Sequence, residues 1–268
     1  MSTPEQHFAV PIMPLDDHPG GAVVCTEPAS QVYLLTFDSP ADNRLTHNFI
    51  AAMLTALDLV EARLSPGVLV TTSAIAKFYS NGLDLGLLSS VDRFFENHLY
   101  KLLSRLISYP MPTVALVNGH AFAGGFMLAM HHDYRVFSGA KGYLSVNEID
   151  FGASIPTALL NIYQIKVHPT FVRDTVLEGK RWSAQAALAA GIIDSTEGWS
   201  GVEKLIVERS LVKKGSTGVY RQLKKGIYRE QLALLDGEGD EGIEFGKKME
   251  AEAGEIAAAK KRATASKL

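Results

Sequence analysis

The feature that most constrains the fold is a glycine-rich turn between a strand-like and a helix-like segment. Residues 118–128 read NGHAFAGGFML and follow the apolar stretch TVALV. Gly119 and Gly124 have the G-x-x-x-x-G spacing of a phosphate-binding loop. Such a loop continues with Lys and then Ser or Thr, where this chain has Gly125 and Phe126. Without those two side chains, a nucleoside triphosphate with magnesium is a poor ligand for the turn.

A smaller anion suits the same turn better. Ala121, Ala123 and the two adjacent glycines allow a close approach to the backbone. Free N–H groups at the start of a helix favour negative charge, so the oxygen of a polarised carbonyl is a suitable ligand. Tight packing of a helix on a sheet also uses small residues. The turn alone therefore leaves both interpretations open.

The order of the apolar segments predicts an α/β fold with parallel strands. Gly20 and Gly21 are expected to open the ordered part of the chain, and from about residue 156 onward the patterns are helical. Strands are expected at 22–28, 32–38, 68–74, 113–119 and 134–139, with helices at 46–64, 91–108 and 126–131. Thr46 and Ser183 are suitable N-caps, and Gly191 is a suitable residue just after a helix.

Composition excludes several classes of protein. The net charge of -3 lacks the basic excess expected of a nucleic-acid binder. No apolar run approaches the roughly 20 residues of a membrane-spanning helix. Cys25 is the one cysteine, which argues against a disulfide framework. The first residues have neither the apolar stretch of a secretory signal nor the arginines of a transit peptide.

The last three residues, Ser266, Lys267 and Leu268, form an S-K-L tripeptide. At a free C-terminus this tripeptide is an address read by the peroxisomal import receptor. We therefore expect that receptor to be a partner and the peroxisome to be the location.

A second loop completes a family pattern. Residues 78–86 read FYSNGLDLG and follow the preceding strand, so two successive strand ends could offer backbone N–H groups to one oxygen, as in an oxyanion hole. This loop, the NGHAFAGG turn and the stretch LEGKRWSAQAALAAGIID at 177–194 together resemble the enoyl-CoA hydratase/isomerase (crotonase) superfamily. The closest likeness is to the peroxisomal plant-type Δ3,Δ2-enoyl-CoA isomerases.

The resemblance implies a crotonase-like ββα spiral core at 1–200. It also implies a helical C-terminal region at 201–268, either part of the same domain or an appendix for assembly as a homotrimer or hexamer. Carried over, the backbone N–H groups of Leu83 and Gly124 would form the oxyanion hole for an acyl-CoA thioester. The substrate-binding residues would be Ser80, Asn81, Gly82, Phe122, Phe126, Met127 and Lys77. No cofactor is implied, because CoA is part of the substrate.

The resemblance also indicates which reaction to expect. Hydratases of the family hold a water between two glutamates. Here Met127 occupies the first position, and Glu148, in YLSVNEIDFG, matches the second. One carboxylate with an oxyanion hole implies a proton shuttle, in which Glu148 moves the double bond of a 3-enoyl-CoA to the 2-trans position. Apolar neighbours would raise the pKa of Glu148, as a general base requires.

Alternatives remain at several positions. Asp150 could be a second acid, Asp84 could fix the loop geometry, and the His131–Asp133 stretch could cap a helix or, less simply, bind a metal. Arg44, Lys77 and the pair at 224–225 could meet the CoA phosphates or be solvated. A hydratase, a dienoyl-CoA isomerase and a non-catalytic acyl-CoA-binding protein are the competing functions. The sequence fixes neither the acyl-chain length nor the cis or trans preference.

Overall fold

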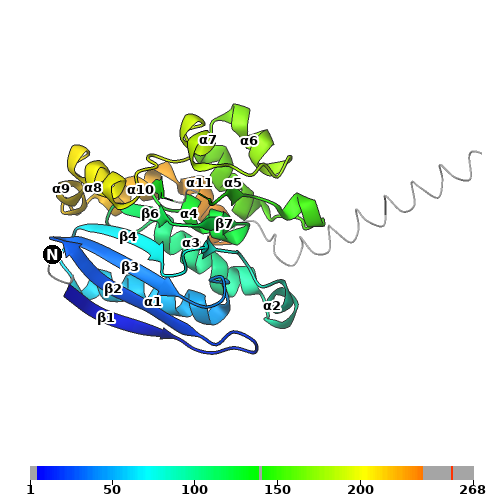
Figure 1. Ribbon diagram of the computed structural model, residues 1–268, viewed down its shortest axis with the longest axis horizontal. Helices are drawn as coiled ribbons and strands as arrows, with labels where there is room; N and C mark the ends of the chain where they lie inside the picture. Colours follow the sequence, from blue (N-terminus) through cyan, green and yellow to red (C-terminus); the bar gives the residue numbers. More distant parts are fainter. Residues whose placement is uncertain (1–4, 139–140, 238–254, 256–268) are drawn as a thin grey trace, which may run out of the picture.

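The computed structural model describes residues 5–138, 141–237 and 255, and contains two β-sheets. The larger sheet has six strands in the order β1-β2-β3-β4-β6-β8, and the smaller has three in the order β5-β7-β9 (Figure 1). The strands are β1 (Glu5–Ile12), β2 (Gly21–Ala29), β3 (Val32–Asp38), β4 (Val68–Ser73), β5 (Phe78–Ser80), β6 (Thr113–Val117), β7 (His120–Phe122), β8 (Tyr134–Phe137) and β9 (Leu144–Ser145).

The larger sheet changes from antiparallel to parallel along its width. β1 pairs antiparallel with β2, and β2 with β3, whereas β3, β4, β6 and β8 run parallel. The hairpin and the parallel strands confirm the expected α/β class. The expectation that order begins at Gly20 is wrong, because β1 lies upstream and pairs with residues 21–27 of β2. Its side chains alternate in burial only at the Val10–Ile12 end, so its sequence pattern was weak.

The α-helices are α1 (His47–Arg63), α2 (Leu85–Ser90), α3 (Tyr100–Ile107), α4 (Gly124–Met130), α5 (Thr157–Lys166), α6 (Pro169–Val176), α7 (Ala184–Ala189), α8 (Gly198–Glu208), α9 (Leu211–Gly215), α10 (Tyr220–Ile227) and α11 (Arg229–Leu235). A π-helical turn, η1 (Phe95–Leu99), precedes α3, and a 3-10 turn, η2 (Glu148–Phe151), follows β9. Thr46 caps α1, as expected, by accepting from the Phe49 N–H at 3.1 Å. None of the helices in the described part of the chain is long and apolar enough to cross a membrane.

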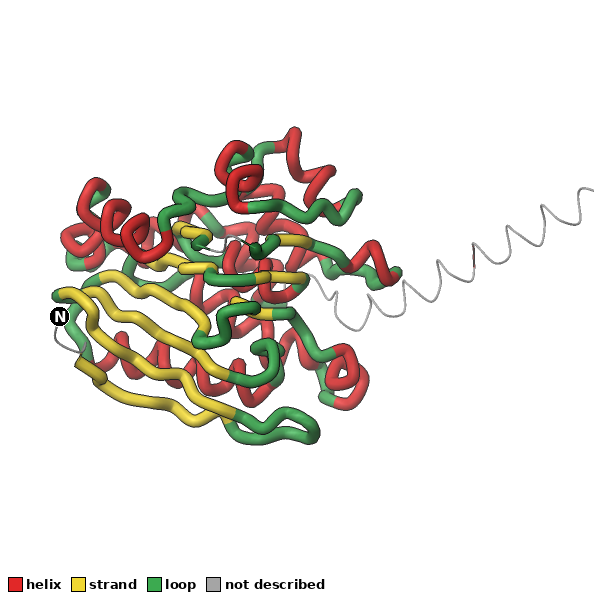
Figure 2. The backbone as a smooth tube through the Cα atoms, in the orientation of Figure 1, coloured by secondary structure: helices red, strands yellow, loops and turns green. Residues whose placement is uncertain are grey.

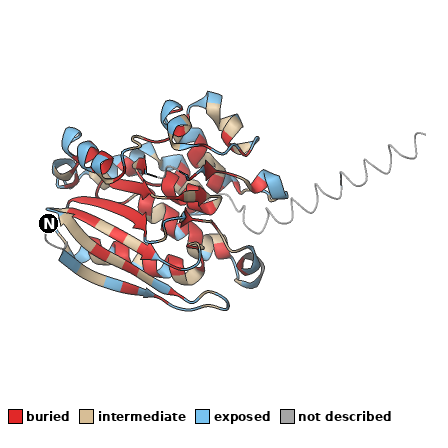
Figure 3. Cartoon of the chain, in the orientation of Figure 1, coloured by how far each residue is buried: buried red, intermediate tan, exposed pale blue. Residues whose placement is uncertain are grey.

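Helices cover both faces of the larger sheet (Figures 1 and 2). One face packs on α1 and α3 in the main core, which includes Phe49, Leu57 and Leu103. The other face packs on α8 and α9 through a smaller cluster that includes Val202 and Leu211. Since β4 and β6 are buried along their whole length, they form the centre of the molecule, as Figure 3 shows.

The C-terminal region is joined closely to the rest of the described chain. Helix α8 runs through the expected boundary at residue 200 and packs against β6 and β8. Farther on, Arg221 of α10 pairs with Glu61 of α1 at 2.6 Å. Helices α8 and α9 therefore share a core with the larger sheet, and α11 packs on α3 and α5. The S-K-L tripeptide at 266–268 lies outside the described residues.

Candidate functional site

The smaller sheet brings three of the expected site residues to one edge. Leu83 follows β5, Gly124 follows β7 and Glu148 follows β9, each within three residues of the strand end. Because these strands are parallel neighbours, their carboxyl ends lie at the same edge, where open α/β sheets commonly bind ligands. The sequence patterns did not predict this sheet, since strands of two or three residues leave no periodicity.

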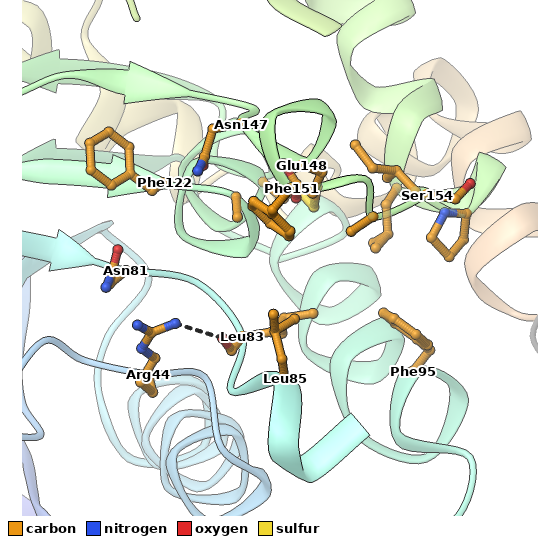
Figure 4. A pocket seen from close by; sticks show the side chains of 16 residues that line it. Arg44, Asn81, Leu83, Leu85, Phe95, Phe122, Asn147, Glu148, Phe151 and Ser154 are labelled. Carbon is orange, nitrogen blue, oxygen red and sulfur yellow. Dashed lines mark hydrogen bonds between the residues drawn. The ribbon is translucent and has the colours of Figure 1, made fainter. Parts of the chain in front are cut away.

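A cavity of about 330 Å³ opens at this edge. Its polar lining comes from Arg44, Asn81, Asn147, Glu148 and Ser154. Figure 4 shows Arg44, Asn81 and Leu83 on one wall and Asn147, Glu148 and Phe151 on the wall opposite. The rest of the lining is mostly apolar: Leu83, Leu85, Phe95, Phe122, Ala123, Met127, Phe151, Ala153, Ile155, Pro156 and Leu159. The cavity thus suits a ligand with an apolar chain and a polar end.

Glu148 is the one acidic residue in the wall of this cavity. It begins η2 and is 8% exposed, and its Oε2 atom has no hydrogen-bond partner among the described residues. Burial raises the pKa of its carboxyl from 4.5 to about 7. A carboxyl with that pKa can both take up and release a proton near neutral pH.

Tyr163 lies close enough to sense the charge of Glu148. It belongs to α5, one turn beyond the cavity residue Leu159, and is completely buried, with no hydrogen-bond partner for its hydroxyl in the described chain. Burial, and next the negative charge of Glu148, raise the pKa of Tyr163 well above its usual value. This tyrosine is therefore neutral and adds no charge beside the carboxyl.

The backbone N–H of Leu83 has a fixed direction. The carbonyl of Gly82, in the same peptide unit, accepts from the Leu45 N–H at 2.9 Å. In a trans peptide the N–H points away from the carbonyl, so the Leu83 N–H points away from Leu45. No described residue accepts a hydrogen bond from it. This donor remains available to a ligand in the cavity, which Leu83 lines.

The N–H of Gly124 is oriented by the start of α4. The carbonyl of Ala123, in the same peptide unit, accepts from Phe126 and Met127 N–H at 3.0 and 3.1 Å, as the first carbonyl of a helix does. The Gly124 N–H consequently points out of the helix, and no described residue accepts from it. The turn requires φ of 50° and ψ of -123° at Ala123, a conformation unusual for a residue with a Cβ.

Two glycines allow the loops after β5 and β7 to touch. Gly82 has φ of 82°, and a Cβ there would lie 2.8 Å from the Phe122 carbonyl oxygen and 3.0 Å from the Gly124 nitrogen. A Cβ on Gly125 would lie 2.2 Å from the carbonyl oxygen of Ser80. Close packing and a backbone donor without an acceptor among the described residues are therefore both present at this turn, although Gly124 itself is buried and is not among the residues of the cavity wall. The sequence left two explanations open for the small residues of this turn. Close packing applies to Gly125, and a backbone donor applies to its neighbour Gly124.

The other residues expected to bind substrate divide into two groups. Asn81, Phe122 and Met127 line the cavity, whereas Ser80, Gly82, Phe126 and Lys77 do not. Ser80 is buried, and its hydroxyl accepts from Gly82 N–H and donates to the Asn43 carbonyl. Phe126 is buried against Tyr163, with ring centroids 5.3 Å apart. Lys77 is exposed over the Phe78 ring.

Of the remaining charged candidates, only Arg44 reaches the cavity. Its guanidinium donates to the Leu83 carbonyl at 2.9 Å. Asp150 is exposed and is not part of the cavity wall. Asp84 caps α2 by accepting from Gly86 N–H at 2.8 Å, which agrees with a role in loop geometry. Lys224 is buried in an ion pair with Asp133 at 2.9 Å, so the suggestion that it meets a CoA phosphate is wrong.

The His131–His132 pair belongs to the core. Both rings donate through Nδ1–H, His131 to the Met127 carbonyl and His132 to the Leu128 carbonyl, at the end of α4. Burial lowers the pKa of each to about 3, so both are neutral. No group of three or more metal-ligating side chains occurs within the described ranges. The helix-end interpretation is thus the one the geometry supports.

Sequence reasoning missed several residues of the cavity wall. Phe95 comes from η1, within a segment expected to be one continuous helix, and Asn147 immediately precedes Glu148. Ile155, Pro156 and Leu159, at the start of α5, also line the cavity. Only a three-dimensional arrangement brings these segments together, and no local pattern distinguished them from core residues.

The comparisons with known proteins agree with this geometry. The family model for enoyl-CoA hydratase/isomerase matches residues 27–256. Arabidopsis thaliana enoyl-CoA delta isomerase 3 is 30% identical over 227 residues, covering 80% of this chain and 95% of the relative. Peroxisomal enoyl-CoA delta isomerase 2 of the same plant is 30% identical over 230 residues, with 79% and 95% coverage.

Solved structures have the same fold. An enoyl-CoA isomerase of Mycobacterium tuberculosis superposes with a TM-score of 0.67 at 26% identity, covering 80% of this chain and 96% of that one. Human mitochondrial Δ3,Δ2-enoyl-CoA isomerase gives a TM-score of 0.71 at 21% identity, covering 83% and 89%. The second likeness concerns the fold alone. Both are crotonase folds, in agreement with the expected fold class.

Proposed function

Because the chain belongs to the enoyl-CoA hydratase/isomerase family, we propose that it is a Δ3,Δ2-enoyl-CoA isomerase with Glu148 as its single acid–base residue. The observation that supports this most is the cavity wall, where one buried carboxyl of raised pKa faces the loop of Leu83. Met127 stands in the same wall, where a hydratase of the family would have its other glutamate. The Arabidopsis relatives, named as isomerases, give independent support.

In the proposed mechanism, the thioester oxygen of a 3-enoyl-CoA accepts from the N–H groups of Leu83 and Gly124. Ionised Glu148 removes a proton from C2, and the charge of the resulting dienolate rests on that oxygen. Protonated Glu148 then returns the proton at C4, which gives the 2-trans-enoyl-CoA. Acid–base assistance of this kind contributes about a hundredfold to ten-thousandfold, and each oxyanion donor about a hundredfold to a thousandfold.

Methionine at position 127 favours isomerisation over hydration. Its thioether cannot transfer a proton or orient a water as a carboxylate does. Together with Phe95, Phe151 and Leu159 it makes the surroundings of Glu148 apolar. A water beside the dienolate would have few partners there, so the proton on Glu148 returns to carbon.

We also propose a setting for this activity. Two of the Arabidopsis relatives are named peroxisomal, and the S-K-L tripeptide at 266–268 has the form of a peroxisomal address. Isomerisation there would serve the β-oxidation of unsaturated fatty acids. Assembly as a homotrimer or hexamer and import by the S-K-L receptor belong to the same proposal. Deletion of residues 266–268 should abolish peroxisomal import of the protein in cells.

Two substrates test the reaction. The wild type should convert 3-hexenoyl-CoA to 2-hexenoyl-CoA and should hydrate crotonyl-CoA poorly. The Glu148→Gln variant should lose about a hundredfold to ten-thousandfold of the isomerase rate. Asp150→Asn, which alters an exposed carboxylate two residues away, is the matched control and should remain active.

The results also discriminate among the competing functions. Rapid hydration of crotonyl-CoA would indicate a hydratase, and conversion of a dienoyl-CoA in preference to 3-hexenoyl-CoA would indicate a dienoyl-CoA isomerase. Tight binding of acyl-CoA in calorimetry, with no turnover of any of these substrates, would indicate a non-catalytic binding protein. An undamaged Glu148→Gln isomerase would remove the carboxyl from the mechanism.

A further inference from the structure

The loop of Leu83 is fastened to the segment that precedes α1. Hydrogen bonds join residues 42–45 to residues 78–83 at several points. We call residues 42–45 the 42–45 clamp. Asn81 N–H donates to the Asp42 carbonyl at 2.9 Å, and Ser80 Oγ donates to the Asn43 carbonyl at 2.7 Å. Leu45 N–H donates to the Gly82 carbonyl at 2.9 Å. The Leu83 loop is thus held along its length by a segment about forty residues away in sequence.

Arg44 is the positively charged member of the clamp, and Asp42 is the negatively charged one. Its Nη1 donates to the Leu83 carbonyl at 2.9 Å, and its Nε donates to Asp42 Oδ2 at 3.1 Å. The same carboxylate oxygen accepts from Asn81 Nδ2 at 2.6 Å. Figure 4 shows the Arg44 guanidinium directed toward Leu83 at the wall of the cavity. Asp42 therefore both neutralises the guanidinium and directs it at the Leu83 carbonyl.

The loop needs such fastening because Gly82 lacks steric restraint. Its φ of 82° lies in a region open to glycine, and a glycine peptide can rotate through many orientations at little cost. The Leu45 and Arg44 contacts hold the carbonyls of Gly82 and Leu83, on either side of the Leu83 Cα. The Leu45 contact fixes the peptide unit that contains the Leu83 N–H, and the Arg44 contact fixes the next unit, so the backbone cannot turn about the Leu83 Cα between them.

We propose that Arg44 is a positioning residue, which holds the Leu83 backbone so that its N–H stays directed at the thioester oxygen. This inference rests on the proposed function, since it assigns Leu83 to the oxyanion hole. It differs from a contact between Arg44 and the CoA phosphates. Two of the guanidinium nitrogens are already occupied by Asp42 and Leu83, and the charge is balanced by a carboxylate.

Two thioesters of one acyl group separate these roles. Isomerase kinetics are measured with 3-hexenoyl-CoA and with the N-acetylcysteamine thioester of 3-hexenoic acid, which has no phosphate. For Arg44→Ala, kcat should fall about tenfold to hundredfold with both thioesters, because a misplaced group costs in this range. KM should change little. Guanidinium ion at millimolar concentration should restore part of kcat, and Arg44→Lys should lie between the wild type and the alanine variant.

Two results would overturn the inference. A rise in KM seen only with the CoA thioester would assign Arg44 to the phosphates. Unchanged kinetics with both thioesters would remove Arg44 from any role in turnover. Arg63→Ala, at the exposed end of α1, is the matched control and should behave as the wild type. Circular dichroism and thermal unfolding establish that each variant is folded.

A spectroscopic measurement tests the role of Arg44 without depending on isomerase turnover. Infrared difference spectra of bound crotonyl-CoA, with and without a carbonyl ¹³C label, report how strongly the thioester carbonyl is polarised. The wild type should lower the carbonyl frequency, and Arg44→Ala should move it back toward the value in water. That result would support the role of Arg44 even if 3-hexenoyl-CoA proved not to be a substrate. An identical frequency in both proteins would contradict it.

Discussion

Two carboxyl groups removed from water, Glu148 and Asp133, have opposite surroundings. Asp133 has a side chain 10% exposed and accepts from Thr113 N–H at 2.9 Å, from Lys224 Nζ at 2.9 Å and from Tyr220 Oη at 3.4 Å. Glu148 is similarly buried, yet its Oε2 has no partner among the described residues. The two carboxyls therefore differ in pairing rather than in burial. Because the pKa of Glu148 is about 7, its ionised and protonated states are close in free energy near neutral pH, which suits it to moving a proton.

The largest expected effect comes from removing the charge of Asp133. Asp133→Asn leaves the Lys224 ammonium buried, with the Leu106 carbonyl at 3.3 Å as a remaining acceptor. Breaking a buried pair in this way should cost about 3–5 kcal/mol of stability, measured by urea unfolding. At a temperature where the variant is folded, its isomerase rate should remain near that of the wild type.

The partner of Asp133 gives the control for that experiment. Adding Lys224→Met to Asp133→Asn removes the uncompensated charge, so the double variant should regain most of the lost stability. If the double variant were as unstable as Asp133→Asn, the loss would come from the contacts to Thr113 rather than from the buried ion pair.

The pH dependence of the rate should reflect the carboxyl without a partner. Because burial raises the pKa of Glu148 to about 7, kcat/KM should rise about tenfold per pH unit below 7 and level off above it. Other titratable groups near the cavity are Arg44, Tyr163 and, on η2 itself, Asp150. A profile that is flat from pH 5 to 8 would show that no group of this pKa takes the proton.

A cation placed beside Glu148 would give this carboxyl a charged partner, as Lys224 does for Asp133. Met127 lies in the same cavity wall and is 2% exposed, and Met127→Lys keeps a long, flexible stem there. A nearby ammonium favours the carboxylate, so the midpoint of the rate profile should fall by about one pH unit or more. The rate on the plateau should fall as well, because a less basic carboxylate is a weaker base. An unmoved midpoint in the folded variant would mean that position 127 does not influence the carboxyl.

The raised pKa of Glu148 should also make the stability of the protein depend on pH. The pKa of Glu148 is raised in the folded chain, so between about pH 4.5 and 7 the native state binds the extra proton and its stability falls as pH rises. Glu148→Gln has no such penalty. Relative to the wild type, it should gain little at pH 4 and up to about 3 kcal/mol above pH 7, in urea unfolding at both pH values. An equal difference at both would argue against a raised pKa.

The comparison also shows what a sequence can reveal. Thr46 and Ser183 cap helices as their local patterns predict, since capping involves only neighbouring residues. Glu148 could be identified because the residues around it resemble a family motif. The burial of Lys224 could not be predicted, because its partner Asp133 is 91 positions away in the sequence. The residues next to a lysine do not distinguish a buried side chain from a solvated one.

The cavity wall was predicted only in part for a similar reason. Leu83 and Met127 belong to local motifs, whereas Phe95 and Asn147 reach the cavity through the packing of η1 and η2. The smaller sheet was missed because its hydrogen bonds join segments of two or three residues that are far apart in sequence. The smaller sheet forms because the loops after β5 and β7 pack closely together. Gly82 and Gly125 permit that close packing, but their presence does not specify it.

The three-stranded sheet has a consequence for how new activities could arise on this scaffold. Its strands lie about 4.8 Å apart, a spacing that main-chain hydrogen bonds set, and they bring the loops that carry Leu83, Gly124 and Glu148 to one edge. The two proposed donors are backbone groups, so they survive almost any change of side chain at Leu83. In the proposed mechanism, only positions such as 127 and 148 supply functional side chains. A change of chemistry would therefore require one or two codons, while the backbone donors proposed to hold the thioester would be inherited unchanged.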